Sequence, residues 1–463
     1  MKALSTRGNA PAVSIADAIA AGLAPDGGLY MPDSWPSFSP AEFDGDETTA
    51  QVAMRMLAPF FAGDALAPEL AAICADAFHV EPPLRAFGKD GDFVLELFHG
   101  PTAAFKDYGA RFLAGCLAAL PRADGKPLTI VVATSGDTGA AVAGAFHGRP
   151  GIRVAILYPD GRVSPRQAHQ LGCFGDNIRA FRVDGSFDDC QRIAKALLSD
   201  AAFRDQVPLG SANSISLGRL FPQAAYYARA ALLHWRATGN ALNFVVPTGN
   251  LGNALACLLA KRLGLPIGEI VLASNANDVL PAFFAGAEYA PRASIATLAN
   301  AMDVGAPSNF ERLQWLYPDA AELRRVLRAE AVGDDAIRQA ILRTRATREY
   351  IACPHTACAA EVLDRLRARA DLRAVAAPRP IARGSALAAG RLATRRGGSK
   401  LDSPGCSRSA GSGRCSTGCR RAARTKSPSS LTKIPPPSKL DQIGPLDVSA
   451  HHHVVRHDAE QRT

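Results

Sequence analysis

The sequence predicts an α/β fold in which parallel sheets are covered by helices, with a small N-terminal cap and a basic C-terminal tail. Three observations support this prediction. Between residues 128 and 273, short apolar or β-branched runs alternate with helical patterns, as in repeated βαβ units. Residues 1–90 are interrupted early by proline and glycine, and they read as helical and loop-rich. All 31 aromatic residues lie before residue 375.

The first part of the alternation comprises three strands with helices between them. Residues 128–133 predict a buried strand, and a Gly-rich turn leads to a helix over 140–146. A second strand is predicted at 152–158. Ser164 and Pro165 then supply an N-cap and a first-turn proline for a helix that ends near Gly172.

The second part continues the same pattern. A strand at 178–183 leads to a helix whose apolar residues recur at helical spacing: Phe187, Cys190, Ile193, Ala194 and Leu197. Two further strands are predicted at 242–246 and 270–273, with a helix between them.

The net charge of +9 comes from the tail. Residues 375–463 contain 16 Lys and Arg against 5 Asp and Glu, which leaves a net charge of −2 for residues 1–374. A segment so basic and free of aromatic residues cannot build an ordinary core, so we predict that it is disordered. The predicted divisions are a cap at 1–90, a catalytic α/β region at 91–374 and a tail at 375–463.

Composition also bears on location. At 463 residues and 48% hydrophobic content, the chain can bury large cores. Neither an apolar run long enough to span a membrane nor a signal-peptide pattern is present in the sequence. The ten cysteines are scattered rather than arranged as a small disulfide framework, which is typical of thiols in a reducing cytoplasm. We therefore predict a cytoplasmic protein.

Two strand-to-helix turns are polar and rich in glycine. Residues 134–139 read Thr-Ser-Gly-Asp-Thr-Gly, and residues 247–253 read Pro-Thr-Gly-Asn-Leu-Gly-Asn. Glycine lets backbone N–H groups turn inward, and the following helix directs the positive end of its dipole to the same place. A tight turn alone explains one such loop equally well. Two of them in one parallel sheet predict a ligand with more than one anionic group.

A third segment, residues 97–108, reads Leu-Phe-His-Gly-Pro-Thr-Ala-Ala-Phe-Lys-Asp-Tyr. From the pattern alone, Lys106 reads as a solvated helix residue. The segment nevertheless resembles the signature around the pyridoxal-phosphate (PLP) lysine of the threonine synthase family. The turns at 135–139 and 249–253 are similar to that family's Ser-Gly-Asp-Thr-Gly and cofactor phosphate loops, although the family usually has Phe at Leu251.

Further matches keep the family order and span about residues 1–362. They lie at 5–8, 22–30, 213–216 and 275–278, and the family usually has Asn at Ser216. Cysteine synthases and serine or threonine dehydratases share the fold-type II design but normally have Asn where Asp137 stands. Asp137 and the Leu-Ala-Pro-Asp-Gly-Gly run at 23–28 therefore favour the threonine synthase family.

The resemblance implies a fold-type II (tryptophan synthase β-like) PLP enzyme that converts O-phospho-L-homoserine and water to L-threonine and phosphate. Lys106 would hold pyridoxal 5'-phosphate as a Schiff base and act as general base and acid. The cofactor phosphate would be bound by Gly249, Asn250, Leu251, Gly252 and Asn253. The substrate carboxylate would lie near Ser135, Asp137 and Thr138, and the leaving phosphate would face Asn213 and Ser214.

The chain departs from the family pattern at two places. Cys353 replaces the acid of the family's Asp-Pro-His-Thr. The spacing of Cys353, His355 and Cys358 matches no standard zinc site, so we predict no metal. After Ala374, the family continues with a strand and a Thr-Ala-His-Pro-Ala-Lys-Phe segment whose threonine lies near the PLP ring nitrogen.

Here, residues 374–380 read Ala-Val-Ala-Ala-Pro-Arg-Pro, and a frame-shifted or otherwise replaced C-terminus is our interpretation. It predicts a sheet that lacks its last strand, a marginal fold, weak activity, low solubility and tryptic cleavage between Arg379 and Lys439. A catalytically impaired relative is therefore one alternative. A nucleic-acid-binding protein that acts through the tail is another, but the tail has no aromatic residues for stacking. The oligomeric state, monomer or dimer, stays open.

Overall fold

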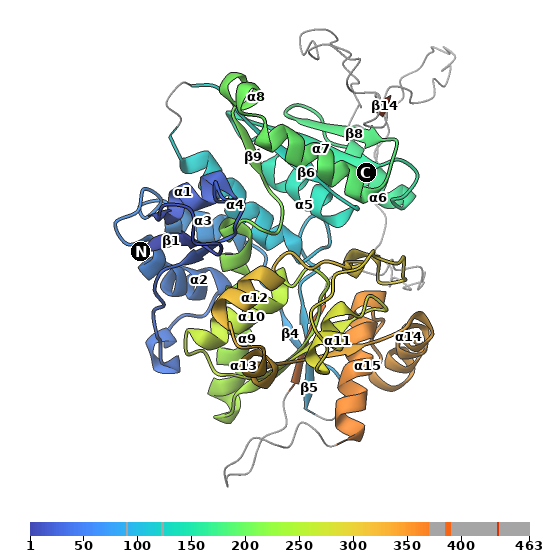
Figure 1. Cartoon of the computed structure of the whole chain (residues 1–463). Helices are drawn as coiled ribbons and strands as arrows, with labels where there is room; N and C mark the ends of the chain where they lie inside the picture. Colours follow the sequence, from blue (N-terminus) through green and yellow to red (C-terminus); the bar gives the residue numbers. More distant parts are fainter. Residues whose placement is uncertain (89–90, 122–124, 370–384, 390–432, 435–463) are drawn as a thin grey trace, which may run out of the picture.

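The computed structural model describes residues 1–88, 91–121, 125–369, 385–389 and 433–434. Two mainly parallel sheets with helices around them form the body of the molecule, and the N-terminal cap lies against its side (Figure 1). The predicted α/β class is confirmed. Among the described residues, no helix is both long and apolar enough to span a membrane.

The cap contains a small antiparallel sheet as well as helices. Its strands β1 (Lys2–Ser5), β2 (Val13–Ser14) and β3 (Tyr30–Pro32) are ordered β2-β1-β3. The helices are α1 (Ile15–Ala21), η1 (Pro40–Phe43), α2 (Thr49–Leu57), η2 (Ala58–Phe61) and α3 (Leu70–Ala77). The prediction of a helical and loop-rich cap did not include this sheet, because strands of two to four residues are too short to show an alternating pattern.

A five-stranded parallel sheet follows the predicted βαβ alternation closely. Its order is β14-β8-β7-β6-β9, and its strands are β6 (Leu128–Ala133), β7 (Ile152–Pro159), β8 (Ile178–Val183), β9 (Leu209–Ser211) and β14 (Lys433–Ile434). Its helices are α5 (Asp137–Phe146), α6 (Pro165–Gly172), α7 (Phe187–Ser199) and α8 (Ala201–Gln206). Capping boxes start α6 at Ser164 and α7 at Ser186, where the sequence signal for each helix start is strongest.

A six-stranded sheet has the order β12-β11-β10-β13-β5-β4, in which only β4 is antiparallel to its neighbour. The strands are β4 (Leu84–Ala86), β5 (Asp92–Glu96), β10 (Leu242–Pro247), β11 (Ile267–Ser274), β12 (Leu327–Ala331) and β13 (Ser385–Ala389). Its surroundings include α11 (Val279–Phe284), η3 (Asn300–Met302), α12 (Phe310–Leu316), α13 (Ala320–Val326), α14 (Asp334–Arg348) and α15 (Pro354–Ala368).

The strand β13 corrects our expectation for the C-terminal segment. We predicted that the replaced C-terminus leaves the sheet without a strand, yet the backbone of Ser385–Ala389 pairs in parallel with both β10 and β5. A parallel ladder is made by backbone groups, so a short uncharged run can fill this position. Five residues without a β-branched side chain give too weak a signal to predict. The rest of the predicted tail, apart from β14, lies outside the described residues.

The two Gly-rich turns belong to different sheets, which corrects the prediction that they share one. The turn at 134–139 follows β6 of the five-stranded sheet, and the turn at 247–253 follows β10 of the six-stranded sheet. Alternation along the chain reveals βαβ units but does not reveal which sheet a strand joins. The helices α4 (Lys106–Ala119), α9 (Leu217–Thr238) and α10 (Gly252–Arg262) pack together in the interior.

Two ion pairs made by one carboxylate connect the cap to this interior. The carboxylate of Asp76 in α3 accepts hydrogen bonds from Arg111 of α4 and from Arg149, which follows α5. Burial alone would raise the pKa of the Asp76 carboxyl, but the bonds from Arg149 and Arg111 outweigh burial and lower it. The carboxylate thus stabilises the fold above the pKa it has in the unfolded chain, and this contribution is lost as the pH falls through the lower, folded pKa.

We therefore expect Asp76→Asn to reduce the free energy of unfolding at pH 7 by about 0.5–1 kcal/mol, a modest value because the side chain is partly exposed. The difference from wild type should shrink as the pH falls below about 4. Urea unfolding at several pH values measures it. Asp44→Asn, at an exposed position, is the matched control. A difference that does not change with pH would contradict the assignment.

Candidate active site

Lys106 is the first residue of α4, and its neighbour Asp107 shapes the loop before it. The Asp107 carboxylate accepts hydrogen bonds from the backbone N–H (3.0 Å) and the hydroxyl (2.5 Å) of Thr102. A Cβ on Gly100 would lie 2.5 Å from the same carboxylate, so only glycine fits there. Burial raises the pKa of the Asp107 carboxyl, against the opposing effect of the bonds from Thr102. Asp107 therefore holds in place the loop that immediately precedes Lys106.

The amine of Lys106 lies beside the carboxylate of Asp137. Lys106 Nζ is 3.8 Å from Asp137 Oδ2, and the two side chains are only 16% and 6% exposed. Asp137 begins α5, in a turn where the Thr134 hydroxyl accepts hydrogen bonds of 2.9 Å from the backbone N–H groups of Gly136 and Gly139. Opposite charges at this separation favour the charged form of both groups. The structure thus brings two residues predicted from separate motifs into one pair.

The turn after β10 is held in an unusual backbone conformation. Leu251, the residue before α10, has φ 65°, a left-handed conformation that costs a non-glycine residue about 1–3 kcal/mol. A Cβ on Gly249 would lie 2.8 Å from both the Cα and the carbonyl oxygen of Met302, so a side chain there would displace the backbone of that segment. The first backbone N–H groups of α10 have no acceptors within the helix and are directed toward this turn.

The two asparagine side chains of this turn have different tasks. Asn253 braces the turn, because its Oδ1 accepts from the Thr248 hydroxyl (2.7 Å) and its Nδ2 donates to the Pro247 carbonyl (2.9 Å). Asn250 reaches outward, and its Nδ2 donates to the Ser214 hydroxyl at 2.7 Å. The predicted phosphate loop and the predicted substrate loop at 213–216 are therefore in direct contact.

Residues 299–303, which lie against Gly249, are braced by two other motifs. Asn275 Nδ2 donates to the carboxylate of Asp303 at 2.8 Å and to the Ala299 carbonyl at 3.2 Å. His355 Nε2 accepts from the backbone N–H of Ala301 at 3.2 Å. The motifs at 275–278 and 354–357 thus support the predicted phosphate loop through residues 299–303. Among the described residues, no cluster of three or more potential metal ligands occurs.

Arg312 is a central residue of the site that the sequence did not reveal. It is fully buried in α12. Its guanidinium donates to the Tyr30 carbonyl of the cap (3.1 and 3.2 Å), to the Ile215 carbonyl (2.6 Å) and to Asn309 Oδ1 (2.7 Å). Asn309 Nδ2 in turn donates to the Asn250 carbonyl at 2.9 Å. An arginine in a helix normally indicates a solvent-exposed side chain. The signal in the sequence was its spacing of three residues from Asn309, which places the two side chains next to each other on a helix.

The helix that begins at Lys106 and the loop at 213–216 are connected at the start of α9. Arg219 in its first turn donates to the Ala212 carbonyl at 2.7 Å. Its own carbonyl would lie 2.9 Å from a Cβ on Gly109 of α4, so glycine allows the two helices to approach closely. The first turn of α9 therefore connects the helix that begins at Lys106 with the loop that contacts Asn250. Ser135 is exposed, whereas Thr138, Asn213 and Ser214 are partly buried.

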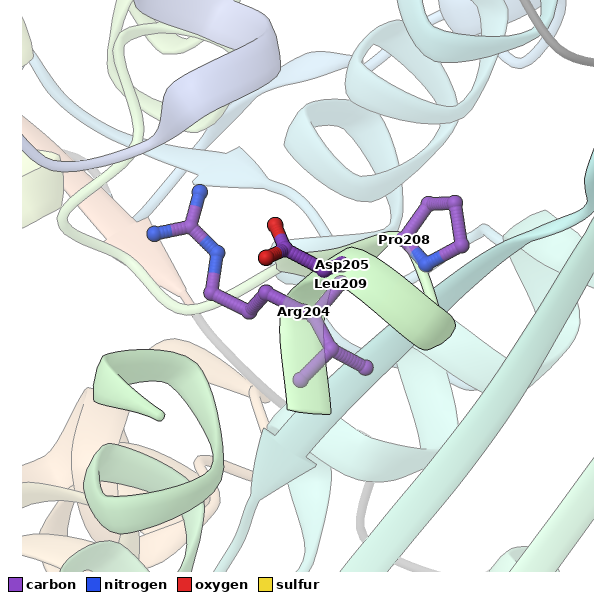
Figure 2. Close-up of a pocket in the computed structure, with 4 residues that line it drawn as sticks. All are labelled: Arg204, Asp205, Pro208 and Leu209. Atoms are coloured by element: carbon purple, nitrogen blue, oxygen red, sulfur yellow. The ribbon is translucent and has the colours of Figure 1, made fainter. Parts of the chain in front are cut away.

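A surface hollow lies away from these residues. Arg204, Asp205, Pro208 and Leu209 line a space of about 420 Å³ between α8 and β9 (Figure 2). None of the candidate site residues lines it. The hollow therefore contributes nothing to the assignment of the site, which depends on the contacts described above.

A nucleophilic amine in a largely buried position, combined with a glycine-containing loop at a helix N-terminus, suits a cofactor that has both an aldehyde and a phosphate. A family model described as "Pyridoxal-phosphate dependent enzyme" matches residues 85–376. A second model, "Threonine synthase N terminus", matches residues 2–78. The chain belongs to the threonine synthase family.

Individual relatives support this membership. The threonine synthase of Serratia marcescens is 40% identical over 365 residues, which cover 78% of this chain and 84% of the relative. That of Escherichia coli K12 is 39% identical over 367 residues, with the same coverage of 78% and 84%. A crystal structure of PLP-bound threonine synthase from Brucella melitensis has a TM-score of 0.74 and 35% identity, and it covers 84% of this chain and 89% of that chain.

Membership in the threonine synthase family confirms the fold-type II architecture and pyridoxal 5'-phosphate as the cofactor. The two matched models follow each other along the chain, the N-terminal one within the cap and the PLP-dependent one after it. The roles of Lys106 and of the other site residues in this chain stay predictions.

Proposed function

We propose that this chain catalyses the PLP-dependent conversion of O-phospho-L-homoserine and water to L-threonine and phosphate. The observation that carries the proposal is the pair formed by Lys106 at the start of α4 and Asp137 at the start of α5. Family membership and the contact between Asn250 and Ser214 support it. Lys106 would bind PLP covalently, and the cofactor phosphate would be held by Gly249, Asn250, Leu251, Gly252 and Asn253.

When bound, PLP supplies an electron sink for bonds at the carbon atoms of an amino acid substrate. Lys106 would remove and return protons at those carbons, because its amine is the basic group of the site and is largely shielded from water. The Asp137 carboxylate would keep this amine in place and stabilise its charged form. The backbone N–H groups at the start of α5, with the hydroxyls of Ser135 and Thr138, would bind the substrate carboxylate.

Asn213 and Ser214 would face the phosphate that leaves the γ carbon of the substrate. Ser214 is held by Asn250, so the loop for the leaving phosphate and the loop for the cofactor phosphate would be positioned together. The β carbon would lose one proton before phosphate leaves. Afterwards the hydroxyl of water would join the β carbon, the γ carbon would gain a proton, and the other proton of water would be released. Lys106 is the residue that would transfer the protons at the two carbons.

The substrate is thus a small phosphorylated amino acid.

The seven cysteines of the described residues are free thiols, which supports a location in a reducing cytoplasm.

We expect phosphate release from O-phospho-L-homoserine in clear preference to turnover of O-acetyl-L-serine or L-threonine. Asp137 and the predicted substrate loop at 213–216, which would face the leaving phosphate, are the features that motivate this choice. Parallel assays with the three compounds measure it, with threonine identified among the products. Equal turnover of O-acetyl-L-serine would instead assign the chain a cysteine-synthase activity.

A further inference from the structure

Gln167 is a buried polar side chain that contacts the proposed catalytic pair from a third helix. It lies in the first turn of α6 and is only 1% exposed. Its Nε2 donates a hydrogen bond to Asp137 Oδ1 at 3.1 Å, whereas the other carboxylate oxygen, Oδ2, is the one near Lys106. The Asp137 carboxylate therefore lies between an amide from α6 and an amine from α4.

The capping box of α6 fixes the orientation of this amide. The backbone N–H of Ser164 donates to Gln167 Oε1 at 3.1 Å, and the backbone N–H of Gln167 donates to Ser164 Oγ at 3.2 Å. Because Oε1 accepts from the N-cap, the Nε2 group must face the opposite way, toward Asp137. The same local signal that starts the helix thus directs a donor into the site.

Glycines let α6 come close enough for this contact. A Cβ on Gly136 would lie 2.3 Å from Gln167 Nε2, and a Cβ on Gly139 would lie 2.6 Å from Leu171 Cδ2. Gly136 also has φ 137°, which L side chains rarely adopt. The two glycines of the Ser-Gly-Asp-Thr-Gly turn therefore make room for α6, in addition to shaping an anion site.

We propose that Gln167 is a positioning residue that holds the Asp137 carboxylate toward Lys106 and thereby sets the charge of that amine. The inference rests on the proposed function only in taking Lys106 as the PLP lysine. From α4, the charged amine of Lys106 faces Asp137. From α6, the neutral amide of Gln167 faces the same carboxylate. An amide suits this position because it donates to a carboxylate without competing with the lysine for it.

Two substitutions separate this role from a purely structural one. Gln167→Glu keeps an acceptor for the Ser164 N–H, so the helix start is preserved, but it places a second carboxylate beside Asp137. At the alkaline pH where a lysine amine titrates, both carboxylates are ionised and favour the ammonium form of Lys106. Gln167→Met removes the donor, which lets Asp137 turn away and weakens its support of that form. The two variants should therefore shift the pH at which the Lys106 amine loses its proton in opposite directions.

The measurement is the pH dependence of acylation of Lys106 in the full chain after removal of PLP with hydroxylamine, quantified by mass spectrometry of its peptide. We expect the midpoint to rise by about half a pH unit or more in Gln167→Glu and to fall by a similar amount in Gln167→Met. The visible band of the PLP-loaded chain should titrate with shifts in the same directions. The kcat for phosphate release should fall about tenfold in each variant, with a smaller change in KM.

Gln170→Glu is the matched control, because it adds the same charge to the same helix outside the capping box, and it should leave the midpoint unchanged. Shifts in the same direction for both Gln167 variants, or none, would overturn the proposal. A wild-type chain that fails to bind PLP would defeat the proposed function, whereas the acylation result would still decide the role of Gln167.

Discussion

Replacing Lys106 with alanine is expected to lower kcat/KM for phosphate release from O-phospho-L-homoserine by about 10³-fold or more, because the covalent link to PLP and the proton-transferring amine are both lost. Lys106→Arg should be equally inactive. It keeps a positive charge beside Asp137, but a guanidinium does not form the link. The fold should survive in both variants, since the side chain of Lys106 lies at the start of α4 rather than within the apolar core.

The measurement combines the phosphate-release assay with borohydride reduction of the PLP-loaded chain and peptide mapping. In wild type, the reduced label should be found on the peptide that contains Lys106. Lys195→Ala, at an exposed position in α7, is the matched control and should retain both the label and the activity. A label on any other lysine, or substantial turnover by Lys106→Ala, would show that the PLP lysine has been assigned wrongly.

The local parts of the site were predictable because each has a signal confined to a few adjacent residues. The strand β6 and the turn at 134–139 follow one another directly, and the capping box at Ser164 marks the start of α6. Chemistry that depends on such contiguous segments can be read from the sequence. The pairing of Lys106 with Asp137 followed only once two such segments were placed in the fold.

Relations between distant segments were not predictable in the same way. Neither the division of the two Gly-rich turns between two sheets nor the placement of β13 between β10 and β5 has a local pattern. Gln167 and Arg312 are polar residues in short helices, and composition alone assigns such residues to the surface. Their burial follows from close approach at glycines or from backbone carbonyls of segments distant in the sequence.

Arg312 illustrates how a buried charge can serve alignment more than stability. Burial lowers its pKa to about 9, so its hydrogen bonds only partly replace the water it has lost. Within the described part of the chain, its acceptors are neutral groups: the carbonyls of Tyr30 and Ile215 and the side chain of Asn309. These groups belong to the cap, to the proposed substrate loop and to the residue that holds Asn250. One planar guanidinium therefore fixes the relative positions of three segments around the site.

We expect Arg312→Met to lower kcat/KM for phosphate release by about 100-fold or more, because displacements near 1 Å in a catalytic arrangement have effects of that size. The free energy of unfolding of the Arg312→Met variant should be only about 1–3 kcal/mol below that of wild type. Methionine removes the cost of burying a charge as well as the hydrogen bonds. Arg312→Lys should also lose activity, because a single amine cannot reach all three acceptors.

Steady-state kinetics, urea unfolding and hydrogen exchange of the backbone near Tyr30 and at 213–216 test this prediction together. Arg324→Met is the matched control, because Arg324 also donates to two backbone carbonyls, those of Phe283 and Ala287, but is partly exposed. Faster exchange should appear at both segments in Arg312→Met and at neither in the control. If Arg312→Met keeps more than about a third of the wild-type kcat/KM, which corresponds to less than about 0.7 kcal/mol of transition-state stabilisation, the alignment of these loops does not depend on Arg312. Its hydrogen bonds would then stabilise the fold without positioning the substrate.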